Sequence, residues 1–519
     1  MVVVGGGPAG LAAAAELSLH GIDCVVIEPR TQVSHRRPRA KTTSVRTMEH
    51  MRRWGIAGRL REAAPLPVAW SQRVTFCESL SGRRITDFDG AFGLTTERSD
   101  LFAEPGQQVP QPVVEEVLRE HLRSRPGVGL RFGHAAAGLS QDEDGVVVAI
   151  RDEHGTVFPA GTVYRLRARY ALGCDGVNGV TRDQVGARYA GRSDPRPNFN
   201  VVFRAPGLDT GLGPAVQYWV VGGAVTGLIG RLNLDGIWWA SFPGVDAGYG
   251  GAHASELIWG LVGKRVPHEV LATDPWTARM LVADTFAAGR VFLVGEAAHV
   301  NPPWGGHGFN TSVGDAVNIA WKIAAVEHGW APPALLASYE DERRGVVEQT
   351  VASAEGNLRA LTGDLPADEA AIQRAKRFEF YSLGLVLGYS YAGSPVIQPG
   401  PGTAAIADTT AYSPAAEPGA RLPHAWMPDG TSLYDRLGPG LTLLGPARPS
   451  AALAERGRAR GIALTLAQAP PSYPWRDEFL LVRPDQHIAW RACDPESIDL
   501  DLVTGRSLME TSRMGTRRR

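Results

Sequence analysis

Val2-Val3-Val4-Gly5-Gly6-Gly7-Pro8-Ala9-Gly10 carries the clearest structural signal in this chain. Its β-branched start predicts a short buried strand, and the Ala-rich run 11–20 that follows predicts a helix. The spacing G-x-G-x-x-G suits a turn that binds a pyrophosphate. Gly5 permits the tight turn, Gly7 lets the backbone approach the phosphates, and Gly10 lets the helix pack closely on the strand. The free N–H groups at the helix start would then face the phosphates.

A second apolar strand, Cys24 to Glu28, follows this helix. The order strand, turn, helix, strand is a βαβ unit and predicts a parallel sheet. Glu28 lies 18 residues after Gly10 at the end of the second strand, where a carboxylate accepts hydrogen bonds from ribose hydroxyls. An acid at this place indicates a ribose without a 2′-phosphate, as in FAD or NAD.

A second motif, Gly173-Cys174-Asp175-Gly176, follows a predicted strand that ends at Leu172, with Arg182 shortly after. Ligands of open α/β sheets bind at the carboxyl edge, which is where this Asp-Gly pair would lie. Asp-Gly is also a common turn pair, so an ordinary turn is the alternative interpretation.

The third motif runs from Val291 through Glu296 and His299 to Pro302-Pro303-Trp304-Gly305-Gly306-His307-Gly308-Phe309-Asn310. A buried strand delivers an acid, and a glycine-rich loop then enters a helix predicted over 310–326. Such an arrangement can hold the redox end of a flavin. The backbone N–H groups of Phe309 and Asn310 can bind the N1–O2 edge, and the helix dipole stabilises the negative charge that develops there. Glycines at 305, 306 and 308 allow the backbone to lie against a planar ring.

The rest of the chain divides into recognisable segments. Closely spaced strands at 200–203, 216–221, 227–232 and 238–242 predict an antiparallel sheet inserted between the dinucleotide-fold segments. Further helices are predicted at 47–53, 112–124 and 334–361, and further strands at 130–132, 146–150, 167–172 and 291–294. Residues 397–423 are rich in Gly, Pro and Ala and indicate a linker, and a small α/β domain follows it.

Composition excludes several classes of function. The net charge of -1 gives no reason to expect nucleic acid, and no apolar run approaches the ~20 residues that span a membrane. The N-terminus lacks the basic leader of a signal peptide, and a few residues are expected to precede the first strand. The four cysteines lie far apart and indicate free thiols in the reducing cytoplasm. No cluster has metal-ligand spacing.

The three motifs, in this order, resemble the flavoprotein aromatic hydroxylases of the p-hydroxybenzoate hydroxylase type. The likeness is to the longer members, which include phenol and aromatic polyketide hydroxylases. It implies an α/β fold with a Rossmann-like FAD-binding domain, an inserted antiparallel β-sheet substrate domain and a C-terminal thioredoxin-like domain. The implied boundaries are 1–65, 105–190 and 285–361 for the FAD domain, 66–104 and 191–284 for the substrate domain, 362–396 for a helical connection, 397–423 for the linker and 424–519 for the thioredoxin-like domain.

The same resemblance implies which residues bind FAD. One departure is that the family usually has Asp where this chain has Glu296, so the family's contact with the ribitol does not transfer directly. Pro303 matches the proline of the family's flavin loop, which corresponds here to Pro302 through Asn310. The implied cofactor contacts are Gly5, Gly7, Gly10, Glu28, Arg39, Gln111, Asp175, Glu296, Gly306, Gly308, Phe309 and Asn310.

The implied activity is a single-component monooxygenase. NAD(P)H would dock transiently and reduce FAD, and O2 would form a flavin C4a-hydroperoxide that hydroxylates a phenolic or polyketide-type aromatic. The site must exclude water, and a nearby base or cation is expected to assist loss of the phenol proton. Arg204, His299 and His307 are the candidates, with a structural role favoured for His299 and His307 kept as a possible catalytic residue.

The inserted sheet is expected to line the substrate cavity. Candidate walls are Phe203, Tyr218, Trp219, Trp238 and Trp239, although strands alternate faces and core packing is the alternative for each. A Baeyer–Villiger or antibiotic-inactivating monooxygenase on the same fold stays open. A tryptophan-type halogenase is disfavoured because Trp-x-Trp-x-Ile-Pro is absent. A non-enzymatic carrier on this fold is a further alternative, and a homo-oligomer is left open.

Overall fold

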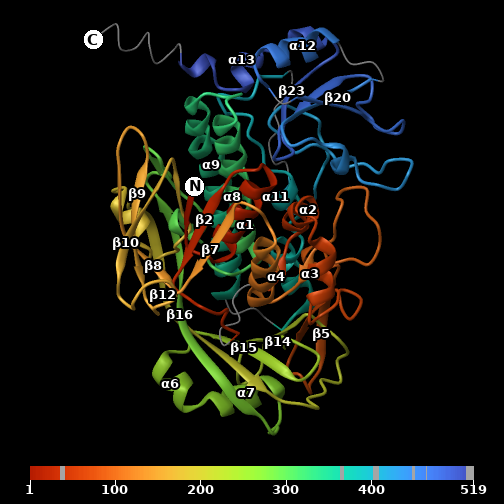
Figure 1. Cartoon of the computed structure of the whole chain (residues 1–519). Coiled ribbons are helices and arrows are strands. Elements are labelled where there is room, and N and C mark those ends of the chain that lie inside the picture. Colours follow the sequence, from red (N-terminus) through yellow and green to blue (C-terminus); the bar gives the residue numbers. More distant parts are fainter. Residues whose placement is uncertain (36–40, 363–366, 401–407, 447–450, 463, 510–519) are drawn as a thin grey trace.

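The computed structural model describes residues 1–35, 41–362, 367–400, 408–446, 451–462 and 464–509 (Figure 1). A central α/β layer lies between an extended sheet with two short helices at one end and a small α/β unit formed by the C-terminal part of the chain at the other. No helix in these ranges is long and apolar enough to cross a membrane.

The central sheet is parallel apart from one edge strand, as the βαβ pattern predicts. Strand β1 pairs in parallel with β2 and β11, and β11 pairs in parallel with β18. The carboxyl ends of β1, β11 and β18 therefore lie side by side, and each is followed by one of the three motifs. In spatial order the strands are β17 (Ala287–Ala288), β18 (Val291–Leu293), β11 (Ala171–Gly173), β1 (Val2–Val4), β2 (Cys24–Glu28) and β7 (Val128–Phe132).

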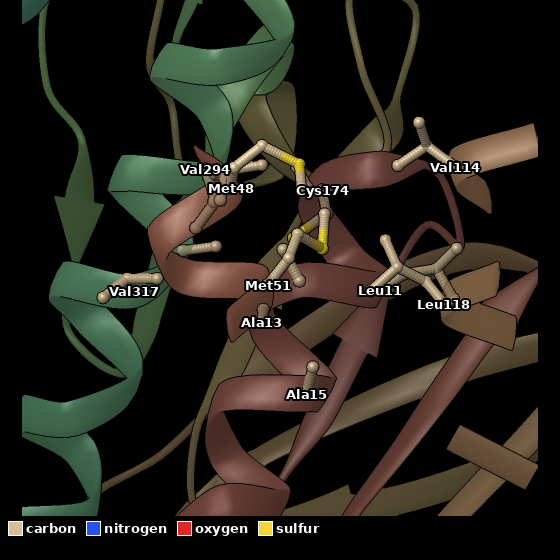
Figure 2. Close-up of a cluster of buried hydrophobic side chains, with 14 of the residues drawn as sticks. Leu11, Ala13, Ala15, Met48, Met51, Val114, Leu118, Cys174, Val294 and Val317 are labelled. Atoms are coloured by element: carbon tan, nitrogen blue, oxygen red, sulfur yellow. The ribbon is translucent and has the colours of Figure 1, made fainter. Parts of the chain in front are cut away.

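Helix α1 (Pro8–Leu19) forms the centre of the core between three other helices. Figure 2 shows its small side chains, Ala13 and Ala15, among Met48, Met51 and Val317 of neighbouring helices. Small residues let α1 approach its neighbours closely, so the glycine-rich turn at its start is held rigidly. Those neighbours are α2 (Val45–Arg53), α4 (Gln111–Arg123) and α8 (His307–Glu327). Helix α8 begins three residues earlier than predicted.

Two long strands, β12 (Tyr189–Arg204) and β16 (Glu269–Ala283), pair antiparallel and run from the central layer into the second sheet. Of these, the sequence predicted only residues 200–203. Prolines at 195, 197 and 275 interrupt the strand pattern, and Pro is normally a sign against a central strand. The ladder accommodates two of them at a bulge between Ser193 and Pro197.

The second sheet has eight strands in the order β19-β16-β12-β15-β14-β13-β4-β5. All its pairings are antiparallel except β13 with β4. Two short helices, α6 (Ala247–Ala252) and α7 (Ala254–Val262), cover one face, and the other face packs on the central layer. The remaining strands are β4 (Arg73–Cys77), β5 (Arg84–Asp89), β13 (Gln217–Val220), β14 (Gly227–Arg231), β15 (Ile237–Pro243) and β19 (His299–Val300).

A separate three-stranded sheet contains β8 (His134–Gln141), β9 (Val146–Asp152) and β10 (Val163–Ala168). Strand β8 was not predicted, because its Ala- and Gly-rich sequence lacks the residues that favour strands. The strand predicted over 167–172 is in fact two, since β10 ends at Ala168 and β11 begins at Ala171.

The C-terminal unit contains a four-stranded sheet in the order β21-β20-β22-β23 with α12 (Ala451–Ala459) between its parallel pair. Its strands are β20 (Leu441–Gly445), β21 (Leu464–Gln468), β22 (Phe479–Val482) and β23 (Ile488–Ala492). The other elements used below are β3 (Thr42–Thr43), α5 (Val180–Gln184), α9 (Ser338–Thr362), α10 (Glu369–Phe380) and α11 (Leu383–Leu387).

Candidate functional site

The three motifs meet at the carboxyl edge of the central sheet. Gly5 has a φ of +105°, and a Cβ there would lie 2.3 Å from the carbonyl oxygen of Cys174. Gly295 of the third motif packs against the first motif. A Cβ on Gly295 would lie 3.1 Å from the Cβ of Ala9 and 2.8 Å from that of Ser312. The backbones of the motifs touch one another directly, so they form one site.

The turn into α1 leaves room for a phosphate. A Cβ on Gly10 would lie 1.9 Å from the carbonyl oxygen of Gly5, so this glycine serves packing. A Cβ on Gly7 would meet nothing within 4 Å, and Gly7 caps α1 without any side-chain capping bond from the described residues. Open space beside unpaired N–H groups at a helix start is the arrangement that binds a pyrophosphate.

Glu28 lies directly under this turn and is 4% exposed. Its Oε2 accepts a hydrogen bond from the backbone N–H of Gly6 at 2.7 Å. Its Oε1 accepts from Arg30, from the backbone N–H at 2.9 Å and from Nε at 2.7 Å. A carboxylate has about four acceptor sites, so capacity for a ribose hydroxyl is left.

Helix α4 carries a buried arginine, Arg119, that the sequence pattern did not single out as a site residue. Gln111 donates from Nε2 to Oε1 of Glu115 at 2.9 Å, and Arg119 lies one turn further on. Arg119 is buried 4.1 Å from the Phe132 ring, and within the described ranges its Nε and Nη2 have no acceptor. Burial lowers the pKa of Arg119. Buried donors without partners fit an anionic ligand such as a dinucleotide. The spacing of Gln111, Glu115 and Arg119 at i, i+4 and i+8 on one helix face was the signal that could have found Arg119.

Arg39, a cofactor contact implied by the resemblance, lies outside the described residues.

In the second motif, Asp175 closes its own loop. Its carboxylate accepts from the backbone N–H of Thr181 at 2.9 Å and from the Thr181 hydroxyl, and burial raises its pKa. Arg182 donates to the carbonyl of Val177 at 3.0 Å and packs 4.1 Å from the Tyr189 ring. The backbone of the motif borders the phosphate turn, whereas the side chain holds the start of α5.

Tyr189 connects the second motif to the third, because its hydroxyl donates to the carbonyl of Glu296. The Glu296 side chain is exposed and extends towards the turn at Gly176. A Cβ on Gly176 would lie 3.9 Å from Oε2 of Glu296. The carboxylate therefore lies at the meeting point of the two motifs, where a ribitol chain would pass between phosphate and ring.

The side chain of Asn310 fixes the flavin loop rather than facing a ligand. Its Oδ1 accepts from the backbone N–H of Ser44 at 2.9 Å and from the Thr47 hydroxyl at 2.7 Å. Its Nδ2 donates to the carbonyls of Thr42 at 2.9 Å and Gly306 at 2.6 Å. Gly306 has a φ of +69° and caps α8, with no side-chain cap among the described residues. The first N–H groups of α8 thus stay available for a flavin.

The neighbours of Asn310 in the loop have other roles. A Cβ on Gly306 would lie 2.9 Å from that of Thr42, so the loop lies flat against β3. Gly308 is similarly limited, since its Cβ would lie 3.2 Å from Oδ1 of Asn301. Pro303 is exposed and Phe309 is half-buried. All four residues lie in the loop or in the first turn of α8, and their contact with a flavin stays a prediction.

Asp315 anchors the loop from within. It accepts from His299 Nε2 at 2.7 Å, from the backbone N–H of Gly295 at 3.2 Å and from Arg343 Nε at 2.7 Å. Burial opposes the charge of Asp315, but Arg343 and His299 outweigh it and lower the pKa. His299 therefore has a structural role, as favoured from the sequence.

His307 lines a small cavity that also contains residues of α2, α9 and α11. Burial lowers its pKa to about 4, so the imidazole is neutral at neutral pH. We do not retain His307 as a phenolate partner. Arg204 lies at the far end of β12, is exposed and pairs with Glu269 at 3.5 Å, so it is not retained either.

The candidate wall residues divide between the two faces of the second sheet. Phe203, Tyr218 and Trp238 pack in the core beneath α7, and the Tyr218 hydroxyl donates to the carbonyl of Gly213 at 2.6 Å. Trp219 and Trp239 lie on the opposite face, which packs on the central layer. Only Trp219 and Trp239 remain candidate substrate contacts. The alternation of side chains along the strands directs Phe203, Tyr218 and Trp238 away from the motifs.

Lys41 is the principal residue that the sequence analysis missed. Its Nζ donates to the carbonyl of Val216 and lies 3.4 Å from that of Arg231, and it is 5.2 Å from the centre of the Trp239 ring. Within the residues described, no carboxylate pairs with it, and burial lowers its pKa to about 7. A Cβ on Gly230 would lie 2.9 Å from Trp239 Nε1 and 3.3 Å from Lys41 Nζ, so this glycine leaves both groups room. Burial depends on distant residues, and no local pattern marks it.

Several buried donors on the same sheet face have no acceptor among the described residues: Nε1 of Trp219, Trp239 and Trp276. Trp276 packs against Trp304 of the flavin loop, with ring centres 5.5 Å apart. Lys376 of α10 lies 4.2 Å from the Trp219 ring and donates to Glu379 at 2.8 Å. The face is therefore aromatic, with cations and unpaired N–H groups at its margins. No group of three metal-ligating side chains occurs in the described part of the chain.

Sequence comparison finds two known families along the chain. The family described as "FAD binding domain" matches residues 1–241 and 253–354, and the family described as "Aromatic-ring hydroxylase, C-terminal" matches residues 415–508. The first match includes all three motifs, and the second includes the four-stranded C-terminal sheet.

Individual proteins are similar over almost their whole length. A 2,4-dichlorophenol 6-monooxygenase of Delftia acidovorans is 30% identical, with 95% of this chain and 94% of the relative aligned. A tetracenomycin B2 monooxygenase-dioxygenase of Streptomyces olivaceus is 30% identical over 98% of this chain and 99% of the relative. The solved structure of the flavin-dependent monooxygenase PieE with FAD and substrate superposes with a TM-score of 0.86, at 27% identity and 98% coverage of both chains.

Proposed function

Because this chain belongs to the FAD-dependent aromatic-ring hydroxylases, we propose that it hydroxylates a polycyclic phenol or hydroxyquinone. The enzyme is an FAD-dependent monooxygenase, for which NAD(P)H and O2 are the usual co-substrates. The substrate would lie between the start of α8 and the face of the second sheet that carries Trp219, Trp239 and Trp276.

One observation carries the choice of substrate class: unpaired indole N–H groups on β16, β15 and β13, all on one face of the sheet. Four strand spacings separate β16 from β13, which is roughly 19 Å at about 4.8 Å per strand. A single aromatic ring covers only a small part of that width. A fused-ring system with several oxygen acceptors can reach the indole N–H groups at both ends of this width. Each indole N–H that stayed buried and unpaired would cost about 1–3 kcal/mol.

Other residues would bind the cofactor, stabilise its charge and exclude water. When bound, FAD supplies hydride uptake from NAD(P)H and oxygen activation. The first N–H groups of α8, at Phe309 and Asn310, would stabilise negative charge at the pyrimidine edge of the ring. Glu28, Gln111, Arg119 and Glu296 would hold the rest of the dinucleotide, and Trp304 with Trp276 would keep water away.

Lys41 is the group we assign to the substrate hydroxyl. A phenol reacts best ortho or para to its oxygen once that oxygen has lost its proton. A buried amine without a carboxylate partner can take that proton and then pair with the phenolate that it has formed. The Trp239 ring beside Nζ stabilises the resulting ammonium by a cation–π interaction.

The test is NAD(P)H oxidation by the purified yellow protein with a panel of single-ring phenols and polycyclic phenols, followed by mass analysis of products. We expect the polycyclic compounds to accelerate oxidation and to gain one oxygen atom. Acceleration by single-ring phenols alone would contradict the substrate class. A ring-expanded lactone would contradict hydroxylation and favour Baeyer–Villiger chemistry.

We also propose a cytoplasmic location. Cys24, Cys77, Cys174 and Cys493 are all free thiols, and Cys493 is exposed. An exposed free thiol is typical of a reducing compartment.

A further inference from the structure

A cavity of about 40 Å³ lies behind the flavin loop, between α2, α8, α9 and α11. Its polar lining includes Arg46 and His50 of α2, His307 of α8, and Arg343 and Thr350 of α9. None of the described residues that line it is acidic. A cavity needs about 10–15 Å³ to hold one water molecule, so this one has room for a small ion together with a water.

Three nitrogen atoms around this cavity are buried and lack a partner among the described residues: Arg46 Nε, His50 Nδ1 and His307 Nε2. Their side chains belong to residues that are 5%, 2% and 4% exposed. Burial lowers the pKa of both histidines, so each is neutral and can present an N–H. Buried donors of this kind are normally satisfied by an unseen acceptor.

The charges in this region do not balance. A buried network connects α2, α8 and α9 to the C-terminal unit, and its pairs include Arg343 with Asp315 at 2.7 Å and Arg483 with Glu342 at 2.6 Å. Burial lowers the pKa of Lys322 to about 8, so this group is still mostly charged at neutral pH. The cations are Arg46, Lys322, Arg343, Arg421 and Arg483, and the anions are Glu49, Asp315, Glu342 and Asp485.

Beside the cavity, Arg46 and Arg421 share one buried carboxylate, that of Glu49, which leaves one positive charge in excess at this point among the described residues. An uncompensated charge in the interior costs several kcal/mol, and a water molecule in the cavity would not remove that cost. A negative ion in the cavity would, because Arg46 and Arg343 both line it.

We propose that this cavity binds a monovalent inorganic anion of chloride size, held by Arg46, His50 and His307 with Arg343 behind them. The ion neutralises the excess charge where the C-terminal unit docks on the FAD domain. It therefore stabilises the contact between the two parts of the chain.

The site also has a consequence for the flavin, which rests on the proposed function. Asn310 and Thr311, in the first turn of α8, line the cavity. A bound anion shares the positive helix end with the negative charge of reduced FAD, so it opposes reduction. The midpoint potential of the bound FAD is expected to be lower in chloride than in a large organic anion.

Crystals of the FAD-loaded enzyme grown in sodium bromide give the direct test. We expect an anomalous difference peak in the cavity, within hydrogen-bonding distance of Arg46 Nε. A cavity that contains only water, without an anomalous signal, would overturn the proposal. This measurement needs no turnover, so it is independent of whether the enzyme accepts any phenol.

Thermal unfolding supplies a solution test. At matched ionic strength, the Tm of the holoenzyme is expected to rise with chloride and to saturate, relative to gluconate. Arg46→Met should abolish this saturable rise. Arg52→Met is the matched control, because Arg52 lies on the same helix but binds Glu104 and Asp435 outside the cavity, and it should keep the rise. An equal response in both variants would contradict the site, and the bromide crystals decide if Arg46→Met does not fold.

Discussion

The amine of Lys41 lies 5.2 Å from the centre of the Trp239 ring, and both groups occupy space left by Gly230 on the neighbouring strand. This places a buried amine, which has no carboxylate partner among the described residues, against an aromatic surface on the sheet face that packs on the flavin-loop layer. The relationship joins the basic loop after β2 to the substrate sheet, two segments far apart in sequence.

The Lys41→Met variant should lose most of its hydroxylation activity while still binding FAD. Base catalysis typically contributes about 10²–10⁴-fold, so kcat/KM for a phenolic substrate should fall within that range. The neutral amine accepts the proton, so the wild-type rate should rise as pH increases through about 7, and the variant should lose that rise. Lys264→Met, at an exposed lysine, is the control. An unchanged pH profile in Lys41→Met would exclude this role.

Gly7→Ala and Gly10→Ala should fail in different ways. A Cβ at Gly7 meets no protein atom within 4 Å, so the apoprotein should fold normally and bind FAD weakly, because the methyl group occupies phosphate space. A Cβ at Gly10 lies 1.9 Å from a backbone oxygen, so that variant should be unstable with or without FAD. Circular dichroism of the apoproteins and flavin fluorescence titration separate the two outcomes. Tight FAD binding by Gly7→Ala would place the phosphates elsewhere.

Arg119→Met should weaken FAD binding and leave the apoprotein as stable as the wild type or more so. The reason is that Arg119 buries two nitrogen donors without acceptors, which is costly until a ligand supplies them. The measurements are Tm of the apoprotein and the Kd for FAD. Arg123→Met, at an exposed position on the same helix, is the comparison. If the apoprotein loses stability and FAD affinity is unchanged, Arg119 is only a structural residue.

Glu28→Gln should raise the Kd for FAD. A hydrogen bond to a charged group is worth about 1.5–3 kcal/mol, which corresponds to roughly 10- to 150-fold in affinity. The variant keeps the shape of Glu28 but loses the charge that accepts from Gly6 and Arg30. Glu116→Gln, on the exposed side of α4, should bind FAD like the wild type. Equal affinities for both variants would remove Glu28 from the cofactor site.

Trp239→Phe and Phe203→Leu should separate the two faces of the second sheet. Trp239→Phe removes an unpaired N–H and should raise KM and increase uncoupled NAD(P)H oxidation, with little change in Tm. Phe203 is fully buried beneath α7, so Phe203→Leu should lower Tm without altering the product ratio. Peroxide formation, product yield and Tm are the three measurements. The assignment of faces would be wrong if the two variants exchanged these effects.

Local patterns predicted the parts of the site that depend on local geometry. The turn at Gly5, the acid Glu28 and the loop into α8 all follow from strand, glycine and helix spacing, and the parallel sheet brings them together as expected. Long-range packing was not predictable in this way. Alternation indicated that Tyr218 and Trp219 face opposite ways, but only the position of α7 shows which of them faces the flavin layer.

The same limit explains the residues that were missed. Lys41 and Arg119, which we add to the proposed site, are buried by distant elements, and a single sequence does not reveal the depth of a side chain. The place of His307 in the loop predicts a position beside the flavin, but its side chain lines the cavity together with Arg343. Strands β12 and β16 were obscured by prolines that a bulge accommodates.

The paired strands β12 and β16, of 16 and 15 residues, also restrict how the enzyme can open. Both continue from the dinucleotide fold into the tryptophan-bearing sheet, so swinging the two lobes apart would require bending a long hydrogen-bonded ladder. Entry and exit of the proposed polycyclic substrate would therefore depend on local displacement of loops and short helices. Residues on β13 to β15 can accordingly change to fit new compounds while the oxidising centre keeps its alignment.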